Sequence, residues 1–202
     1  QTPTPVPTGE NCQLVPNGGF ETMDHWIIGD DPYRPNYTTA EHFNGAQSMR
    51  LGVPADVVTP NVPTYSSVRQ LISIPSNAIG AELHYQIKFH TNQAPDPHPS
   101  NVSDRQELIL LNPDLSTLSE PYPDRILSND NSWQLRHKDL WSYIGDTFFI
   151  YFNVYNDGNG ARTWAYLDDV GLCVPYAATP TATISPTPVA TPTATPSATA
   201  TP

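Results

Sequence analysis

Apolar and polar residues alternate along several stretches of the chain, with the period of two that a β-strand requires. The clearest stretch is 81–90, in which every second residue is apolar: Leu83, Tyr85, Ile87 and Phe89. Similar strand patterns lie at 66–75, 106–112, 147–160 and 163–174. Helical periodicity is hard to find outside 138–146. Many strands separated by Pro, Gly, Asn and Asp clusters, with no helices between them, predict an all-β sandwich or jelly roll.

The two ends of the chain have a composition that cannot support a core. Residues 1–8 and 177–202 consist almost wholly of Thr, Pro, Ala and Ser, with no charged or aromatic residue. Such segments bury too little apolar surface to fold, and proline favours the extended polyproline II conformation. Thr and Ser with Pro are typical of O-glycosylated spacers. We therefore predict a linker at 1–9, a β-domain at 10–175 and a linker or stalk at 176–202, which together imply further domains as partners.

All the charge lies in the predicted domain, and it is strongly acidic. The chain has 20 Asp and Glu against 9 Lys and Arg, a formal net charge of −11. This balance argues against a nucleic-acid partner and against an anionic membrane surface, and it is compatible with neutral ligands and bound cations. No apolar run in the sequence approaches the length of a membrane span.

Two cysteines, Cys12 and Cys173, bracket the predicted domain. A disulfide between them would close a loop that contributes roughly 4–5 kcal/mol, as an upper value, by restricting the unfolded chain. It would also place the protein outside the cytosol, as a secreted or cell-surface protein. The alternative is two unpaired thiols. Asn36 and Asn101 each begin an Asn-x-Ser/Thr tripeptide, an N-glycosylation acceptor where the source organism glycosylates such sites.

Three motifs resemble a known family of sugar-binding domains. They are "LVPNGGFET" from Leu14, followed by Trp26; "GAQSMRLG" at Gly45–Gly52; and "AYLDDVGLC" at the end of the domain. Together they resemble the jelly-roll carbohydrate-binding modules of the family four, nine and twenty-two type, over the whole predicted domain. Thr-Pro spacers are typical of multidomain bacterial surface and secreted proteins. The resemblance implies a non-catalytic module that binds a neutral glycan or polysaccharide.

The adjacent Asp168 and Asp169 stand inside an apolar strand pattern, where an uncompensated carboxylate costs several kcal/mol. Strand alternation puts their side chains on opposite faces, so one metal ion is expected to use only Asp168. The alternative is that Asp168 bonds only backbone amides or an arginine. The resemblance implies a structural Ca²⁺, which takes six to eight oxygen ligands. The implied ligands are Glu21 and Asp168, main-chain carbonyls near Gly18 or Gly19, and Asn44 or Gln47.

Polar faces of two predicted strands make up the expected glycan site. The first polar set is His84, Gln86, Lys88 and His90; the second polar set is Tyr151, Asn153 and Tyr155. We expect both sets to line one concave sheet, where rings stack on sugars and amides bond hydroxyls. The alternative is an ordinary solvated sheet face. Two tryptophans near loops, Trp133 and Trp141, are further platform candidates, whereas Trp26 and Trp164 are expected to pack in the core or at an edge.

Catalytic patterns are absent from the sequence. It has no Gly-x-Ser-x-Gly, His-Glu-x-x-His or phosphate loop, and two adjacent aspartates splay apart and cannot serve as a glycosidase pair. We therefore predict a non-enzymatic protein. The alternative function is a structural or adhesive subunit that uses the same fold for self-assembly. Two polar sets in different sheets, or buried tyrosines, would rule out the joint glycan site and favour that alternative.

Overall fold

A computed structural model describes residues 10–12, 15–57, 62–118 and 124–176. The predicted linkers at 1–9 and 176–202 lie outside these residues, apart from Tyr176. The described part holds one short 3₁₀ helix, η1 (Trp141–Tyr143), and the following strands: β1 (Glu10–Asn11), β2 (Ile27–Ile28), β3 (Asn36–Thr38), β4 (Ser48–Gly52), β5 (Thr64–Ser73), β6 (Glu82–Thr91), β7 (Arg105–Leu111), β8 (Asp124–Ile126), β9 (Trp133–Asp139), β10 (Thr147–Asn156) and β11 (Thr163–Pro175).

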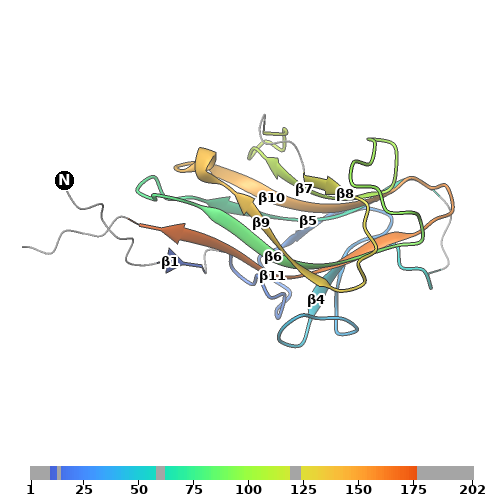
Figure 1. Cartoon of the computed structure of the whole chain (residues 1–202). Coiled ribbons are helices and arrows are strands. Elements are labelled where there is room, and N and C mark those ends of the chain that lie inside the picture. Colours follow the sequence, from blue (N-terminus) through green and yellow to red (C-terminus); the bar gives the residue numbers. More distant parts are fainter. Residues whose placement is uncertain (1–9, 13–14, 58–61, 119–123, 177–202) are drawn as a thin grey trace, which may run out of the picture.

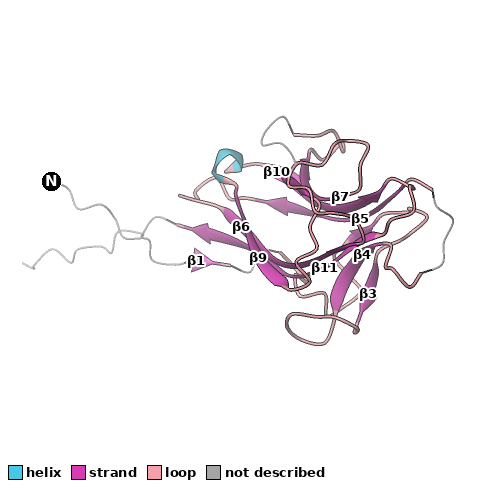
Figure 2. Cartoon of the chain, turned by 45° about the vertical axis from the view of Figure 1, so that its right-hand side comes forward, coloured by secondary structure: helices cyan, strands magenta, loops and turns pink. Residues whose placement is uncertain are grey.

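The strands form two antiparallel sheets that stack face to face (Figures 1 and 2). The terminal sheet has the order β3-β4-β11-β6-β9, and β1 pairs with β11 at one end of it. The second sheet has the order β2-β5-β10-β7-β8. The all-β jelly-roll prediction is confirmed, and the only helix among the described residues lies within the predicted turn at 138–146. No helix in this part of the chain is long and apolar enough to cross a bilayer.

The core lies between the two sheets and follows the predicted alternation. On β6, the four apolar residues from Leu83 to Phe89 are 0–6% exposed. On β10, Ile150, Phe152 and Val154 are equally buried. The rings of Tyr85 and Phe152 meet across the core, with centroids 5.0 Å apart. Because β6 and β10 turn these apolar faces toward each other, their polar faces must point to opposite sides of the sandwich.

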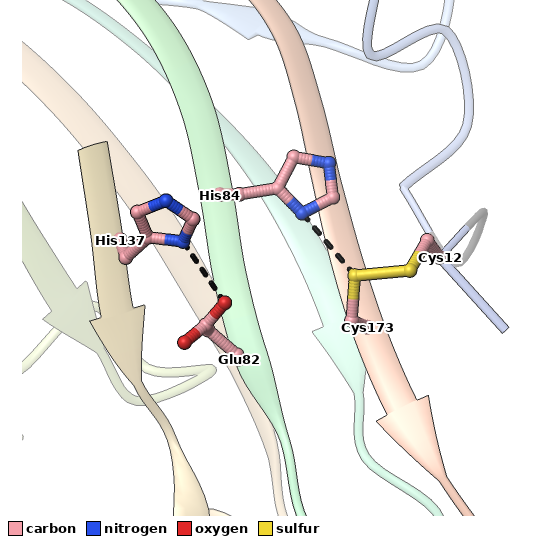
Figure 3. Close-up of a disulfide and its surroundings, with 5 residues drawn as sticks. All are labelled: Cys12, Glu82, His84, His137 and Cys173. Carbon is pink, nitrogen blue, oxygen red and sulfur yellow. Dashed lines mark hydrogen bonds and ion pairs between the residues drawn. A yellow bond between two sulfur atoms is a disulfide. The ribbon is translucent and has the colours of Figure 1, made fainter. Parts of the chain in front are cut away.

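The two ends of the domain are joined covalently, as predicted. Cys12 and Cys173 form a disulfide with Cα atoms 3.9 Å apart (Figure 3). The pairing of Asn11 with Val174 in β1 and β11 brings the two cysteines side by side. Nδ1 of His84, on the neighbouring β6, lies 3.3 Å from Sγ of Cys173.

Candidate functional site

The loop between β3 and β4 encloses the two carboxylates of the expected calcium site. Asp168 Oδ2 accepts hydrogen bonds from the backbone N–H groups of Phe43 (2.8 Å) and Asn44 (3.1 Å). Glu21 Oε1 accepts two more from the backbone N–H groups of Ala46 (2.9 Å) and Gln47 (3.1 Å). Five consecutive residues of one loop therefore hold both acidic side chains.

Gly45 lies at the centre of this loop because no other residue would fit. Its φ is +62°, and a side-chain carbon there would come within 2.1 Å of Glu21 Oε1. Four of the residues expected at the calcium site, Glu21, Asn44, Gln47 and Asp168, are thus brought together. Gly18 joins them through β11, where its carbonyl accepts a hydrogen bond from the Val170 N–H at 2.9 Å.

Asp168 is completely buried, and its charge is costly there. Its Oδ1 accepts a third hydrogen bond, from the Asp169 N–H at 2.8 Å. Burial nevertheless raises the pKa of the Asp168 carboxyl to about 6; the negative charge of Asp169 adds to the effect, and the three amide donors oppose it. The amide bonding is the alternative that the sequence left open for Asp168, and it explains how the strand tolerates an acid.

The expectation that Asp168 and Asp169 lie on opposite faces is wrong. The β11–β6 register shifts between Asp168 and Gly171, and Asp169 adopts a φ of +46°. Such a bulge interrupts the alternation of a strand and redirects a side chain. A methyl group on Gly19 would lie 3.7 Å from Asp169 Oδ1 and 4.0 Å from Asp168 Oδ1, so both carboxylates face the same glycine.

The chemistry of this cluster suits a hard cation. A buried carboxylate with a raised pKa, a second carboxylate facing the same glycine and the nearby Glu21 supply the oxygen donors that Ca²⁺ prefers. Among the described residues, no group of three or more His, Cys, Asp or Glu side chains is placed to hold a metal ion. Main-chain carbonyls would therefore have to supply several ligands.

The prediction that both polar sets line one sheet is wrong. The first polar set lies on β6 in the terminal sheet, and the second polar set lies on β10 in the second sheet. Their apolar neighbours pack against each other across the core, so the two polar faces point outward on opposite sides of the domain. A single groove cannot include both.

The residues of the first polar set also have different surroundings and do not form one site. His84 lies beside the disulfide, and with Gln86 it lines a hollow of about 510 Å³ next to Gly18 and Gly19. Lys88 is 13% exposed and forms an ion pair with Glu41 at 3.1 Å. His90 stacks on Trp164, with centroids 4.8 Å apart and planes 1° from parallel.

Each of the four tryptophans has a distinct place. Trp26 is buried and stacks on Phe20 at 4.9 Å, as expected of a core residue. Trp164 is half-buried on the outer face of the terminal sheet. Of the platform candidates, Trp133 meets the exposed Phe43 edge-on, and Trp141 is 61% exposed on η1.

The second polar set forms part of a larger constellation on the outer face of the second sheet. In register across the strands, Tyr155 lies between Tyr65 and Arg105, Asn153 between Ser67 and Glu107, and Tyr151 between Arg69 and Ile109. Arg125 on β8 lies opposite Glu107. We call this the tyrosine–arginine face; it comprises Tyr65, Ser67, Arg69, Arg105, Glu107, Arg125, Tyr151, Asn153 and Tyr155.

Glu107 organises the polar centre of the tyrosine–arginine face. Its Oε2 accepts hydrogen bonds from Nε of Arg105 and Nε of Arg125, each at 3.0 Å. Its Oε1 accepts one from Nδ2 of Asn153 at 2.8 Å. The Asn153 side chain is thereby fixed with its Oδ1 atom buried and without a hydrogen-bond partner among the described residues. A ligand donor that reached this oxygen would remove the cost of leaving it unpaired.

Two tyrosine rings next to this centre are held in place. The Arg105 guanidinium lies over the Tyr155 ring, 4.3 Å from its centroid, and the Tyr65 and Tyr155 centroids are 4.8 Å apart. Tyr65 is 45% exposed. Burial raises the pKa of the Tyr151 hydroxyl, which stays a neutral donor and acceptor at physiological pH. The face thus combines accessible aromatic rings with fixed polar groups.

The sequence could not identify the arginine and glutamate members of the face. Arg105 and Glu107 flank Gln106 in a run of three polar residues at the start of β7, and such a run does not indicate which side chains share a face with β10. Their role comes from the pairing of β7 with β10, which no local signal encodes.

A second cavity, of about 290 Å³, lies between the sheets near the β8–β9 edge. Its wall combines core side chains such as Tyr85 and Phe152 with polar residues such as Asp124, Arg136 and His137. The ion pair of Lys138 with Asp124, at 3.1 Å, bridges the two edge strands nearby. Glu107, Arg125 and Asn153 of the tyrosine–arginine face also line this cavity, so it adjoins the polar centre of that face.

Comparison with known proteins shows the fold of this chain and does not show its function. No family model and no curated protein match the sequence. The chain is similar to TmCBM61, solved in complex with beta-1,4-galactotriose, with a TM-score of 0.54 and 12% identity over 79% of this chain and 97% of that one. It is also similar to the enzymatically active domain of bacteriophage CBA120 tailspike protein 4, with a TM-score of 0.52 and 15% identity over 80% of this chain and 21% of that one.

A third similar structure is the CBM22-1–CBM22-2 tandem domain of Paenibacillus barcinonensis Xyn10C, with a TM-score of 0.50 and 12% identity. The match covers 90% of this chain and 50% of that one. Such identities show a shared β-sandwich, a fold that hosts unrelated activities.

Proposed function

We propose that this domain is a non-catalytic carbohydrate-binding module whose glycan site is the tyrosine–arginine face. The observation that carries the proposal is the juxtaposition of paired tyrosine rings with a fixed, unpartnered Asn153 oxygen. Aromatic faces bind the apolar faces of sugar rings, and fixed amide and guanidinium groups bond hydroxyls. The fold shared with a galactotriose-bound module supports the same conclusion.

The expected affinity is modest. Stacking on one ring contributes roughly 1–3 kcal/mol, by analogy with base–aromatic stacking. A few such contacts on an open face give binding in the micromolar to millimolar range. The disulfide favours an oxidising, extracellular compartment, where polysaccharides are available as ligands. The Thr-Pro segments in the sequence would then link the module to other domains.

Replacing tyrosines of the face tests the proposal. We expect Tyr65→Ala and Tyr155→Ala each to weaken glycan binding on the order of tenfold, since either loses about 1.4 kcal/mol of stacking. The Arg105 Cζ atom lies closer to the centroid of the Tyr155 ring (4.3 Å) than to that of the Tyr65 ring (5.8 Å), so the half-exposed Tyr65 is the cleaner variant. Binding would be measured by affinity electrophoresis and calorimetry on polysaccharides selected with a glycan array.

The matched control is Tyr166→Ala, a tyrosine on the outer face of the terminal sheet. It should bind as the parent protein does. Equal losses in all three variants, or a loss only in Tyr166→Ala, would move the site away from the tyrosine–arginine face.

We propose in addition that Ca²⁺ binds at the cluster of Glu21 and Asp168, with Gly18 or Gly19, Asn44 and Gln47 as further oxygen donors. A bound cation there would compensate the buried carboxylate and fasten the β3–β4 loop to β11. At a Ca²⁺ concentration of 100 times Kd, the gain is about 2.7 kcal/mol, which raises Tm by about 5 °C or more.

Thermal unfolding with Ca²⁺ and with EDTA tests this site. We expect EDTA to lower the Tm of the parent protein and to have little effect on Glu21→Gln. Glu82→Gln is a suitable control, because Glu82 is a glutamate of the same sheet paired only with His137 (Figure 3). If Ca²⁺ and EDTA give the parent protein the same Tm, the calcium proposal is wrong.

A second candidate function is self-assembly. It is favoured by the separation of the two polar sets, which leaves aromatic groups on the opposite face of the sandwich. Phe43, 48% exposed, and its neighbour Trp133 are the accessible members of that group. Sedimentation velocity distinguishes this function: a concentration-dependent oligomer that Phe43→Ser abolishes would support it, and a monomer at high concentration would exclude it.

A further inference from the structure

We propose that the glycan bound on the tyrosine–arginine face is acidic and carries its charge as uronate carboxylates. This inference rests on the proposed glycan site and goes beyond the neutral ligand that the overall charge predicts. Three of the nine Lys and Arg residues of the chain, Arg69, Arg105 and Arg125, lie on this one face. The acids near them are Glu107 and, through its contact with Ser67, Asp31.

The local charge is therefore opposite in sign to that of the whole chain. Three positive charges and two negative ones leave the face with an excess of one positive charge, within a chain of net charge −11. An anion that approaches this protein would be repelled by the acidic remainder of the surface and attracted to the tyrosine–arginine face. Such local complementarity governs which ligands dock and where.

The excess charge is partly buried, which increases its effect on a ligand. Glu107 is shared by two arginines, and the side chains of Arg105 and Glu107 are only 5% and 2% exposed. Charges screened from water interact more strongly than surface charges do. Arg125, at 24% exposed, is the member of this triad that a ligand can reach.

Arg69 provides a second and separate contact for an anion. Its Nε atom is buried without a hydrogen-bond partner, and no carboxylate of a described residue forms an ion pair with it. It is held over the Phe149 ring, with Cζ 5.7 Å from the centroid. A carboxylate that reached this Nε–H would satisfy the buried donor, and guanidinium groups bind planar carboxylates in a two-pronged geometry that neutral hydroxyls do not reproduce.

The spacing of the arginines favours an oligosaccharide over a single small anion. Arg69 lies on β5 and Arg125 on β8, with β10 and β7 between them. Adjacent strands are about 4.8 Å apart, so the two residues are roughly 14 Å apart across the sheet. A ligand that contacts both must be extended and carry more than one negative group. A uronate oligosaccharide meets this condition and can also stack on Tyr65 and Tyr155.

The experiment compares charged polymers with neutral forms of the same backbone. Polygalacturonate, alginate and glucuronoxylan are each tested beside their carboxyl-reduced counterparts, together with a sulfated glycan. We expect at least one uronate polymer to bind on the order of tenfold more tightly than its reduced form, with the preference falling as salt rises. We expect Arg69→Gln to remove most of that preference and to leave binding of the reduced form unchanged.

Arg50→Gln is the matched control, because Arg50 also has a buried Nε without a partner but lies on the terminal sheet. It should keep the preference for the charged polymer. Equal or tighter binding of the reduced forms overturns the inference and leaves the glycan site standing. Stronger binding of the sulfated glycan than of every uronate overturns the choice of carboxylate. Absence of binding to any charged or neutral glycan overturns both the inference and the proposed function.

Discussion

Replacing Cys12 and Cys173 together with alanine is expected to lower the free energy of unfolding by about 4–5 kcal/mol, an upper value. The disulfide joins residues 161 positions apart and so encloses nearly the whole domain. Without it, the unfolded chain gains the conformational freedom that the closed loop forbids. Urea unfolding followed by tryptophan fluorescence measures the change, since Trp26 lies in the core.

A reductant provides the control for this prediction. It should lower the stability of the parent protein by a similar amount and leave the double variant unchanged. The β1–β11 pairing should also weaken, because β1 has only two residues of ladder to hold it once the covalent link is lost. A parent protein whose urea midpoint does not change on reduction would refute the prediction.

When a chelator is present, the free energy of unfolding is expected to fall by about 3 kcal/mol as the pH rises from 3.8 to above 6, because the buried Asp168 carboxyl ionises over this range. The carboxyl has a pKa of about 6 in the fold against an ordinary value of 3.8. Between these values the folded protein binds more protons than the unfolded chain. The stabilisation that the protonated Asp168 carboxyl provides is therefore fully present below pH 3.8 and is lost as the pH rises through 6.

Asp168→Asn separates this effect from those of other groups. Asp104, also buried, has a raised pKa and contributes in the same direction in both proteins. We expect the difference in stability between the parent and Asp168→Asn to change by about 3 kcal/mol over this pH range. Chemical denaturation at a series of pH values measures it. A difference that stays constant with pH would show that Asp168 ionises normally in the fold.

The alternation along 81–90 and 147–156 was sufficient to predict which side chains enter the core. Because each strand has one buried and one outer face, the period of two identifies both once the strand is recognised. The disulfide was likewise predictable, since cysteines at the two ends of one β-domain meet when its terminal strands pair.

Long-range pairing and local irregularity were not predictable from the same pattern. The two polar sets look alike in sequence, and only the position of β6 and β10 in different sheets separates them. The bulge after Asp168 depends on one positive φ at Asp169, a conformation that the residue type permits but does not require. Glu107 becomes the centre of a charged triad only through strands that neighbour it in space.

The 3.9 Å between the Cα atoms of Cys12 and Cys173 also decides how the domain responds to tension. A pulling force that enters the chain before Cys12 crosses the S–S bond and leaves after Cys173, so only the two residue pairs of β1 with β11 outside the bond share the load, and the rest of the sheets carries none of it. Neither sheet then needs mechanical strength, and the outer faces stay intact while the chain is stretched. Under reducing conditions the same force would unfold the segment between the two cysteines, which are 161 positions apart. The chain would then lengthen by more than about 500 Å.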